Sequence, residues 1–298
     1  MTLAVTPTGA AWGWGNNADR GLGVPYSASN PITQVNTPVG VGLLGAVVEA
    51  APCGTTSFGL RSDGTVWHLP SLVAAGGAPS ASLVVGLPAI ASMGRSGTAL
   101  VGCSLPLVGR DKTVWEMTTA PGGGGTGVLR AWNTTVRQIT GLPAIEQVSC
   151  TGNQEDRGTC LAAASDGTVW AWGAQAGTFV GDYTSPGRTL PIQLPAPVNV
   201  ADVHIGGACT LARLRTGEVW ALQECRTFFD PVNPGVQAGL FPGLAGVVEL
   251  SVGNEHAVVL KADGSVWSFG RNVLGAFGDG LAGNASNVPV RAVGINLN

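Results

Sequence analysis

Charged residues are scarce in this sequence. Only 11% of the 298 residues are Asp, Glu, Lys or Arg, against about 25% in an ordinary soluble domain. There are two lysines, Lys112 and Lys261, and the formal net charge is −3. Nucleic-acid binding needs clustered positive charge to neutralise phosphates, and the sequence contains no such cluster. We therefore expect no nucleic-acid partner.

Long apolar runs are also missing. No stretch approaches the ~20 apolar residues of a membrane-spanning helix, so we expect no membrane insertion. The segment Met1–Pro7 has neither a basic start nor an apolar h-region, which argues against a signal peptide. We expect that a signal has been removed or replaced, or that the protein leaves the cell by another route, such as the lysis that releases virions.

The patterns of catalytic and metal sites are absent as well. None of the three histidines, His68, His204 and His256, stands in a nucleophile–base–acid pattern, and each favours a structural role. The glycine-rich segment Pro121–Gly127 lacks the Lys and Ser/Thr of a phosphate-binding loop. Glu155-Asp156 allows a calcium pair, although a solvated loop is favoured. We predict no catalytic residue, no metal site, no cofactor and no enzyme activity.

The six cysteines favour disulfides over a metal site. No Cys-x-x-Cys occurs, and no histidine stands at zinc-ligand spacing from a cysteine. Three pairings are expected: Cys150 with Cys160 across an acidic loop, Cys209 with Cys225 on the arms of one hairpin, and Cys53 with Cys103 between neighbouring repeats. Disulfides persist in oxidising surroundings, so we expect an extracellular or virion-surface location.

What the sequence does contain is a repeat marked by tryptophan. Six segments, most of them close to x-Asp-Gly-x-Val-Trp, follow one another at intervals of 55, 48, 55, 50 and 47 residues. They end at Trp12, Trp67, Trp115, Trp170, Trp220 and Trp267. These tryptophans are expected to be structural, with large rings that fill space between packed sheets.

Each repeat predicts four short strands. In the last repeat these are Gly246–Leu250, Ala257–Leu260, a strand with Val266-Trp267, and Pro289–Val293. An Asp-Gly turn joins the second strand to the third, because glycine accepts positive φ and Asp bonds nearby backbone N–H groups. Four antiparallel strands in about 50 residues are typical of one propeller blade.

The two ends of the sequence favour a ring over an open solenoid. Thr2–Val5 is typical of a second strand, whereas Gly294–Asn298 resembles the opening of a first strand. Complementary ends remove exposed sheet edges, while a solenoid needs polar caps. We predict an all-β fold, a closed β-propeller of six four-stranded blades whose N- and C-termini share the first blade; seven blades are less favoured. The single domain, 1–298, has blades over about 295–298 plus 1–36, 46–85, 89–140, 144–194, 198–243 and 246–293.

The combined pattern resembles the regulator of chromosome condensation repeat: Gly-x-x-His, an apolar strand, Asp-Gly-x-Val-Trp, then Trp-Gly-x-Asn-x-x-Gly-x-Leu-Gly. The last blade is the most similar, with Gly253–His256, Asp263–Trp267 and Phe269–Gly278. The resemblance covers the whole chain and implies a bacterial or phage branch of that family. Departures are the count of six blades where the family usually has seven, and the loss of the histidine from the other five repeats.

The resemblance implies a propeller that binds proteins, and it leaves the partner open. We expect a non-enzymatic interaction or structural protein, foremost a component of an extracellular or virion surface assembly, with unidentified protein partners. A secreted binding module is the alternative, because a bacterial β-lactamase inhibitor with such repeats binds its target through loops on one face. A guanine-nucleotide exchange factor, the role of the eukaryotic founder, is the weakest alternative, since a basic tail is absent.

Loops between the third and fourth strands differ most between repeats, and such loops on a rigid scaffold are where binding residues concentrate. In the fifth repeat this loop carries Phe228 and Phe229, an aromatic pair without equivalent in the other repeats. Exposed aromatic residues often dominate interface energy, so these two are the candidate partner contacts. Arg213 stands where sister strands are apolar. A guanidinium that snorkels to the channel or pairs locally is favoured over a functional role in lining a polar central pore.

Overall fold

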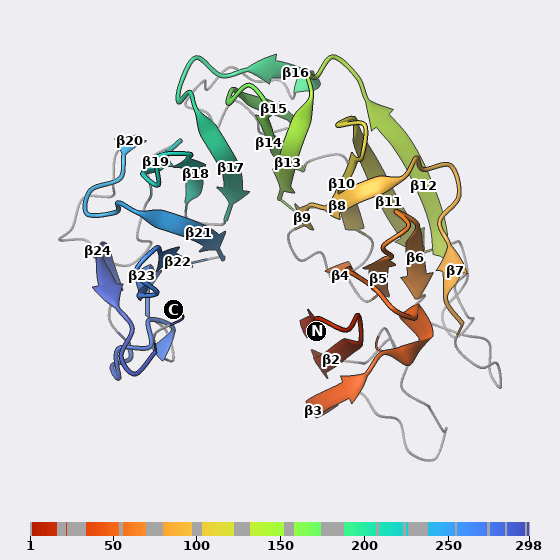
Figure 1. Cartoon of the computed structure of the whole chain (residues 1–298), viewed down its shortest axis with the longest axis horizontal. Coiled ribbons are helices and arrows are strands. Elements are labelled where there is room, and N and C mark those ends of the chain that lie inside the picture. The colour runs from red at the N-terminus through yellow and green to blue at the C-terminus, as the bar shows by residue number, and fades with distance from the viewer. Residues whose placement is uncertain are drawn as a thin grey trace. The chain divides into compact units, whose positions relative to one another are not determined.

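The computed structural model describes residues 2–16, 22, 34–53, 56–69, 80–96, 103–121, 132–151, 158–173, 188–206, 209–222, 225, 238–253, 255–272, 275–283, 285–295 and 297. Their regular structure is almost entirely β, in six antiparallel sheets (Figure 1). Within the described residues, the only helix is the short 3-10 turn η1 (Gly42–Leu44). The sheets are the blades of a six-bladed β-propeller, the fold class that the repeat predicts.

The chain divides into two compact units, and the described residues up to Thr140 form the first. Its sheets have the strand orders β1-β2-β3, β4-β5-β6-β7 and β8-β10-β11-β12. The bounds are β1 Thr2–Val5, β2 Ala11–Asn16, β3 Gln34–Gly40, β4 Glu49–Cys53, β5 Thr56–Leu60, β6 Val66–Leu69, β7 Ser82–Leu83, β8 Ile90–Met93, β9 Arg95–Ser96, β10 Cys103–Gly109, β11 Val114–Pro121 and β12 Trp132–Ile139.

The second unit contains the described residues from Gly141 onward. Its blades have the strand orders β13-β14-β15-β16, β17-β18-β19-β20 and β21-β22-β23-β24. The bounds are β13 Ile145–Cys150, β14 Thr159–Ala164, β15 Val169–Gly173, β16 Arg188–Gln193, β17 Val200–Ile205, β18 Thr210–Leu214, β19 Val219–Ala221, β20 Gly239–Leu240, β21 Val247–Val252, β22 His256–Lys261, β23 Val266–Arg271 and β24 Ala285–Arg291.

The turn between the second and third strands has the same side-chain chemistry in four blades. Asp63 Oδ1 accepts the Thr65 backbone N–H at 2.9 Å and its hydroxyl at 2.7 Å, and Trp67 Nε1 donates to Thr65 Oγ1 at 3.0 Å. The same relay joins Asp111, Thr113 and Trp115, then Asp166, Thr168 and Trp170, and finally Asp263, Ser265 and Trp267. The hydroxyl bond is the main cause that lowers the pKa of each aspartate. The prediction of turn-forming Asp is confirmed.

The turn glycine has two structural roles. Its backbone is left-handed, with φ of +90° at Gly64 and +85° at Gly167, and its carbonyl holds the first strand of the next blade. The N–H of Ile90 donates to Gly64 O, and that of Val200 to Gly167 O, each at 2.9 Å. In the third blade Lys112 has φ of 65°, a conformation that costs a residue with a Cβ roughly 1–2 kcal/mol.

Apolar side chains fill the space between neighbouring sheets within each unit. One buried cluster joins the fifth and sixth blades and contains Leu211, Phe241 and Phe269. Another joins the second and third blades, with Phe58 and Met117 fully buried. Full burial of such a side chain contributes about 1.5–3 kcal/mol, so the sheets are held face to face mainly by these clusters.

Two predicted strand bounds are wrong. The first strand of the second blade, expected from Ala46, begins at Glu49, although the Val47 N–H donates to the Gly9 carbonyl of the preceding turn at 2.9 Å. The last strand, expected over 289–293, spans Ala285–Arg291, and the chain then bends at Gly294, which has φ of +73°.

The backbone N–H of Leu297 donates to Gly264 O at 2.9 Å, the same kind of bond that the other turn glycines accept from the start of a first strand. The C-terminal segment thus begins as the sequence predicts. The described strands of the first sheet are β1, β2 and β3. The sharing of the first blade by both termini stays a prediction.

Candidate functional site

The strand order gives each blade two different ends. Because neighbouring strands are antiparallel, the connection from the first to the second strand and the one from the third to the fourth leave the sheet at the same end. We call this the loop end, and we call the opposite end, with the Asp-Gly turn, the turn end. In the fifth blade the loop end is the end at which β17 stops at Ile205 and β18 begins at Thr210, and the turn end contains 215–218.

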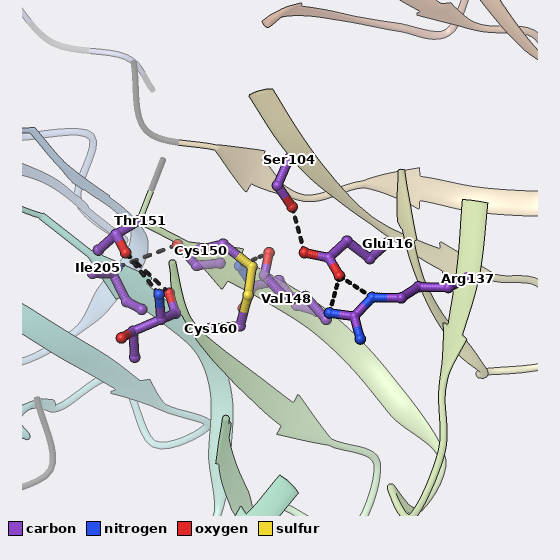
Figure 2. Close-up of a disulfide and its surroundings, with 11 residues drawn as sticks. Ser104, Glu116, Arg137, Val148, Cys150, Thr151, Cys160 and Ile205 are labelled. Atoms are coloured by element: carbon purple, nitrogen blue, oxygen red, sulfur yellow. Dashed lines mark hydrogen bonds and ion pairs between the residues drawn. A yellow bond between two sulfur atoms is a disulfide. The ribbon is translucent and has the colours of Figure 1, made fainter. Parts of the chain in front are cut away.

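The loop end of the fourth blade is closed by a disulfide. Cys150 and Cys160 face each other across β13 and β14 and are joined covalently, with their Cα atoms 4.0 Å apart. Next to them, Thr151 Oγ1 accepts the N–H of Thr159 at 2.9 Å (Figure 2). The two strands therefore stay together at the point where residues 152–157 leave the sheet.

The loop end of the fifth blade has a second disulfide, between Cys209 and Cys225. Cys209 directly precedes β18, and Cys225 follows β19. Both side chains are more than nine-tenths buried, in the cluster that also contains Phe241 and Phe269. This bond ties the start of the second strand to the position from which the loop 226–237 departs.

Cys53, at the end of β4, is also disulfide-bonded. The predicted Cys150–Cys160 and Cys209–Cys225 bonds are confirmed. The pairing of Cys53 with Cys103 stays a prediction, because the side chain of Cys103 lies outside the described residues.

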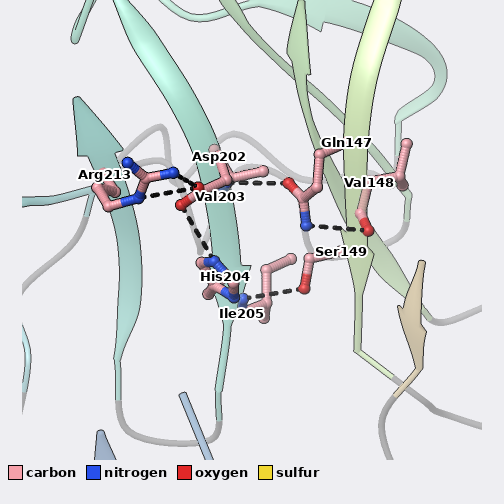
Figure 3. A network of polar contacts seen from close by, with 8 residues as sticks. All are labelled: Gln147, Val148, Ser149, Asp202, Val203, His204, Ile205 and Arg213. Carbon is pink, nitrogen blue, oxygen red and sulfur yellow. Dashed lines mark hydrogen bonds and ion pairs between the residues drawn. The ribbon is translucent and has the colours of Figure 1, made fainter. Parts of the chain in front are cut away.

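The first strand of the fifth blade has a polar cluster, shown in Figure 3. Arg213 on β18 lies opposite Asp202 on β17 and donates to its Oδ2, with Nε at 2.9 Å. His204 Nε2 lies 3.2 Å from Asp202 Oδ1. Burial alone would raise the pKa of Asp202, but the hydrogen bonds from His204 and Arg213 hold it below its usual value. The predicted local pairing of Arg213 is confirmed.

Neighbouring first strands are connected by polar side chains that the sequence analysis missed. Gln147 Oε1 accepts the N–H of Val203 at 3.0 Å (Figure 3), and Glu49 Oε2 accepts that of Met93 at 2.7 Å in the first unit. Gln147 and Glu49 each stand three residues after the start of the first-strand repeat, at Ala144 and Ala46. That shared position was the signal in the sequence that could have revealed them.

The loop of the sixth blade is organised from inside by one side chain. Asn272 is fully buried; its Oδ1 accepts the N–H of Phe277 at 2.9 Å, and its Nδ2 donates to Leu281 O at 3.1 Å. Beside it, Arg271 donates to both carboxylate oxygens of Glu255 at 2.9 and 3.1 Å. This loop therefore has a fixed backbone without a disulfide.

The predicted site residues fall into three groups. Of the repeat tryptophans, Trp12 is 41% exposed, and the five that follow it are partly buried. Phe228 and Phe229, the candidate contacts, lie outside the described residues. His68 is stacked on Phe58 with ring centroids 4.5 Å apart, and burial lowers its pKa to about 4, so the ring is neutral at pH 7.

A separate polar group lies on the third blade, also in Figure 2. Glu116 on β11 accepts the Ser104 hydroxyl at 2.6 Å and pairs with Arg137 on β12, whose Nε lies at 2.5 Å. The Arg137 side chain is largely exposed, and an exposed ion pair of this kind contributes at most about 1 kcal/mol.

Within the described part of the chain, no three His, Cys, Asp or Glu side chains are grouped as a metal site would require. The described segments also contain no helix with the length and apolar character needed to cross a membrane.

Known proteins resemble this chain mainly in fold. The human protein WBSCR16 has a TM-score of 0.72 at 18% identity, covering 98% of this chain and 79% of its own. Yeast RCC1 (Prp20), in a structure bound to Kap60, has a TM-score of 0.67 at 17% identity, covering 97% and 72%. A second structure of Prp20p, from Saccharomyces cerevisiae, has the same TM-score at 18% identity, covering 97% and 74%.

At the level of sequence, no match was found among curated proteins. Residues 247–276 match the family model of the regulator of chromosome condensation (RCC1) repeat. These residues include β21, β22 and β23, the region where the repeat pattern is most complete. Together with the fold, this match supports a β-propeller built from repeats of the RCC1 type.

Proposed function

We propose that this chain is a non-enzymatic β-propeller that binds other proteins through the loop ends of its blades, as a component of an extracellular or virion surface assembly. The observation that carries the proposal is the position of the disulfides. Every described cysteine stands at a loop end: Cys53, Cys150, Cys160, Cys209 and Cys225. The turn ends instead carry the repeated Asp-Gly chemistry.

Fixing the base of a loop favours binding for an entropic reason. A loop that is already ordered loses less conformational freedom when a partner binds, so more of the contact energy appears as affinity. The turn ends are less suited to recognition, because turn carbonyls such as those of Gly64 and Gly167 already hold the next blade. The loop ends also contain the segments that differ most between blades.

Protein partners are the macromolecules that the comparisons favour. One structure of yeast RCC1 (Prp20) is of its complex with Kap60, and a second was described together with the binding of Prp20p to Gsp1p and histones. The low positive charge of this chain gives no basis for nucleic acid. The titratable groups on β17 and β18 are engaged with one another, as Asp202 is with Arg213 and His204, which favours a structural role over catalysis.

The extracellular assembly rests on two observations. The disulfides are compatible with oxidising surroundings. A protein in which only 11% of all residues are charged repels its own copies weakly, a property that suits a protein covered by neighbours. Size-exclusion chromatography with light scattering, on protein from its natural source, tests this. A component of an assembly should elute in large particles. Elution as a monomer near 30.0 kDa would contradict the assembly and leave a monomeric binding module.

A photo-reactive residue tests which end binds. Placed at position 228 in the natural assembly, it should form cross-links to another polypeptide, whereas the same residue at Asp63, on a turn end, should form none. Cross-links from Asp63 alone would contradict the proposed surface.

Replacing both candidate contacts should weaken binding strongly. We expect Phe228→Ala with Phe229→Ala to reduce affinity for the cross-linked polypeptide by about 100-fold, since each aromatic anchor accounts for roughly 1.4 kcal/mol or more. Titration calorimetry measures this. Leu240→Ala, which trims an exposed leucine on β20, is the matched control and should bind normally. Unchanged affinity in the double variant would remove the aromatic pair from the interface.

A further inference from the structure

The outer strands of the blades differ in their protection against pairing with another chain. An outer strand presents unpaired backbone N–H and C=O groups, and proteins block such edges with proline or with very short strands. Among the described outer strands, β7 and β20 have two residues each. Three longer ones contain a proline: Pro38 in β3, Pro191 in β16 and Pro289 in β24. In the third blade, β12 has neither protection.

The three prolines stand at one position of the repeat. Each lies two residues before the residue that faces the repeat tryptophan on the neighbouring strand. In the third blade Trp115 faces Gln138, so the corresponding residue is Val136. The sequence therefore has valine at the place in β12 where three other outer strands have proline.

The backbone of β12 is regular, and its outer side is open. The strand spans Trp132–Ile139 and pairs with β11 at every residue, whereas β3, β16 and β24 each have a register shift against their neighbour. It is a long arrow at the edge of its sheet (Figure 1), and no other described strand pairs with its outer side. Asn133, Thr135 and Arg137 on this strand are exposed.

The repeat also indicates which groups of β12 point outward. In the other five blades, the residue after the partner of the repeat tryptophan donates its N–H inward to the third strand, as Leu194 does to Val169 at 2.8 Å. Ile139 has this position in β12. Because the direction of hydrogen bonding alternates along an antiparallel strand, the N–H and C=O groups of Thr134 and Val136 point away from the sheet.

We propose that β12 pairs antiparallel with β12 of a second copy of this chain, about a two-fold axis that passes between the two copies of Thr135. In this register the outward groups of Thr134 meet those of Val136 in the copy. Those of Trp132 meet those of Gln138 at the two ends. An axis shifted by one residue would leave outward groups at one end without a partner. The contact is separate from the loop ends, so the inference goes beyond the proposed function.

The exposed side chains fit this axis. Thr135 faces its own copy, and its hydroxyl oxygen lies 2.6 Å from that of Thr118 on β11, so a row of threonines crosses the contact. Such cross-strand threonine pairs are favourable. Arg137 faces Asn133 of the copy and is paired with Glu116 of its own sheet (Figure 2), whereas an axis at Arg137 would oppose two arginines. This complementarity of the strand with itself favours a second copy over another polypeptide.

Sedimentation velocity on the whole purified chain tests the contact. One strand pair is a small interface, so we expect a monomer–dimer equilibrium with a dissociation constant of about 10–100 μM. Val136→Pro, which gives β12 the proline of the other outer strands, should weaken dimerisation at least about tenfold. Thr135→Lys, which opposes two like charges, should weaken it similarly. Leu190→Lys, at an exposed position of β16, is the matched control and should dimerise normally.

Two results would overturn the inference. One is a wild-type chain that stays monomeric at about 300 μM, and the other is unchanged dimerisation of Thr135→Lys. The lysine variant decides the matter if Val136→Pro does not fold, because the Thr135 side chain is exposed.

A cysteine trap tests the register. Directly opposite residues of an antiparallel pair have Cα atoms about 4.5–5.5 Å apart, which suits a disulfide. Thr135→Cys with oxidised glutathione, which takes up the two hydrogen atoms, should therefore give a covalent dimer linked from position 135 to itself, identified by mass spectrometry. Asn133→Cys, on the same face, is the control and should stay monomeric, because its own copy would lie about 13 Å away. Equal dimer yields from both variants would contradict the proposed pairing.

The proposed function can fail separately from this inference. If a photo-reactive residue at position 228 forms no cross-link while the chain still dimerises through β12, loop-end binding is wrong and the β12 contact is confirmed. If the purified chain is monomeric and position 135 cross-links to a different polypeptide in the natural assembly, the edge binds another partner and the second copy is wrong.

Discussion

In the fifth blade a cysteine stands before the long loop, and in the sixth blade an asparagine does. Cys225 is bonded to Cys209, whereas Asn272 bonds to Phe277 and Leu281 in its own loop. Both positions are buried. In the fifth blade the residue at this position is thus tied to the start of the second strand, and in the sixth it bonds to residues that follow it.

The two blades differ at the first strand as well. The repeat tryptophans of the two blades, Trp220 and Trp267, are 47 residues apart. At this spacing, Asp202 and Arg213 of the fifth blade correspond to Glu249 and Leu260 of the sixth. The fifth blade carries a partly buried ion pair there, with side-chain exposures of 18% and 20%, and the sixth has no arginine. The fifth blade therefore has an ion pair where the sixth has a glutamate opposite a leucine.

The turns differ in the same way. In the sixth blade, Asp263 and Ser265 complete the relay to Trp267 Nε1. In the fifth, Thr216 donates its hydroxyl to Glu218 at 2.7 Å instead. Three different sets of interactions thus support one backbone path. The repeat specifies strand pairing. The side chains that hold the loop, the first strand and the turn can differ between blades as long as the same backbone path is stabilised.

The largest effect on this comparison is expected from Asn272→Ala. The change leaves the buried Phe277 N–H without its side-chain partner, which costs about 1–3 kcal/mol, and removes the bond to the carbonyl of the exposed Leu281. We expect the free energy of unfolding to fall by about 2 kcal/mol, measured with urea. A loss below 1 kcal/mol would mean that Asn272 does not organise its loop.

The reciprocal exchange sharpens that result. His256→Cys with Asn272→Cys copies the fifth blade into the sixth and should form a disulfide on exposure to oxidised glutathione, visible by mass spectrometry as the loss of two hydrogen atoms. It should recover at least half of the stability lost in Asn272→Ala. Free thiols at both positions would show that the two blades are not interchangeable.

A comparable effect is expected at the ion pair. Asp202→Asn leaves Arg213 without its carboxylate and should cost about 2 kcal/mol, less than for a fully buried pair because both side chains are partly exposed. Asp202→Asn with Arg213→Leu, which has a leucine at this position as the sixth blade does, should lower the free energy of unfolding by less than about 1 kcal/mol. Equal losses of unfolding free energy in both variants would contradict the view that a leucine can replace Arg213 once its carboxylate partner is removed.

The same pair predicts a pH dependence with a definite sign. The folded pKa of Asp202 lies below its unfolded value, so its contribution to stability is complete above the unfolded pKa of about 3.9 and is lost as pH falls through the folded pKa. Asp202→Asn should therefore lose less stability than wild type on acidification below about pH 4.

The smallest effect is expected at the turns. Ser265→Ala removes the hydroxyl that links Asp263 to Trp267 and should cost about 1 kcal/mol. Thr216→Asp with Glu218→Ser installs the relay in the fifth blade and should add about 0.5 kcal/mol. Thermal unfolding measures the stability of both variants. The NMR chemical shift of the Trp220 indole N–H reports whether the new hydrogen bond forms. A shift of the indole signal without any gain in stability would mean that the relay has no energetic role in the fifth blade.

Part of the candidate site could be predicted from the sequence. Two cysteine pairs were identified from their spacing, because Cys150 and Cys160 flank one hairpin loop and Cys209 and Cys225 stand on two arms of another. The role of Asn272 could not be deduced, since its partners Phe277 and Leu281 meet it only through the path of the loop. The carboxylate partner of Arg213 was missed for a similar reason: Asp202 is on the neighbouring strand, and register decides which residues face each other.

The sequence by itself determined the repeat, the turn chemistry and the strand count. These are local properties, because an Asp-Gly turn and an apolar strand of period two act within a few residues of one another. Only the tertiary structure decided which side chains satisfy the groups between strands and blades, as Gln147 does for Val203. Such contacts join residues about 50 positions apart, and their geometry depends on how one sheet lies against the next.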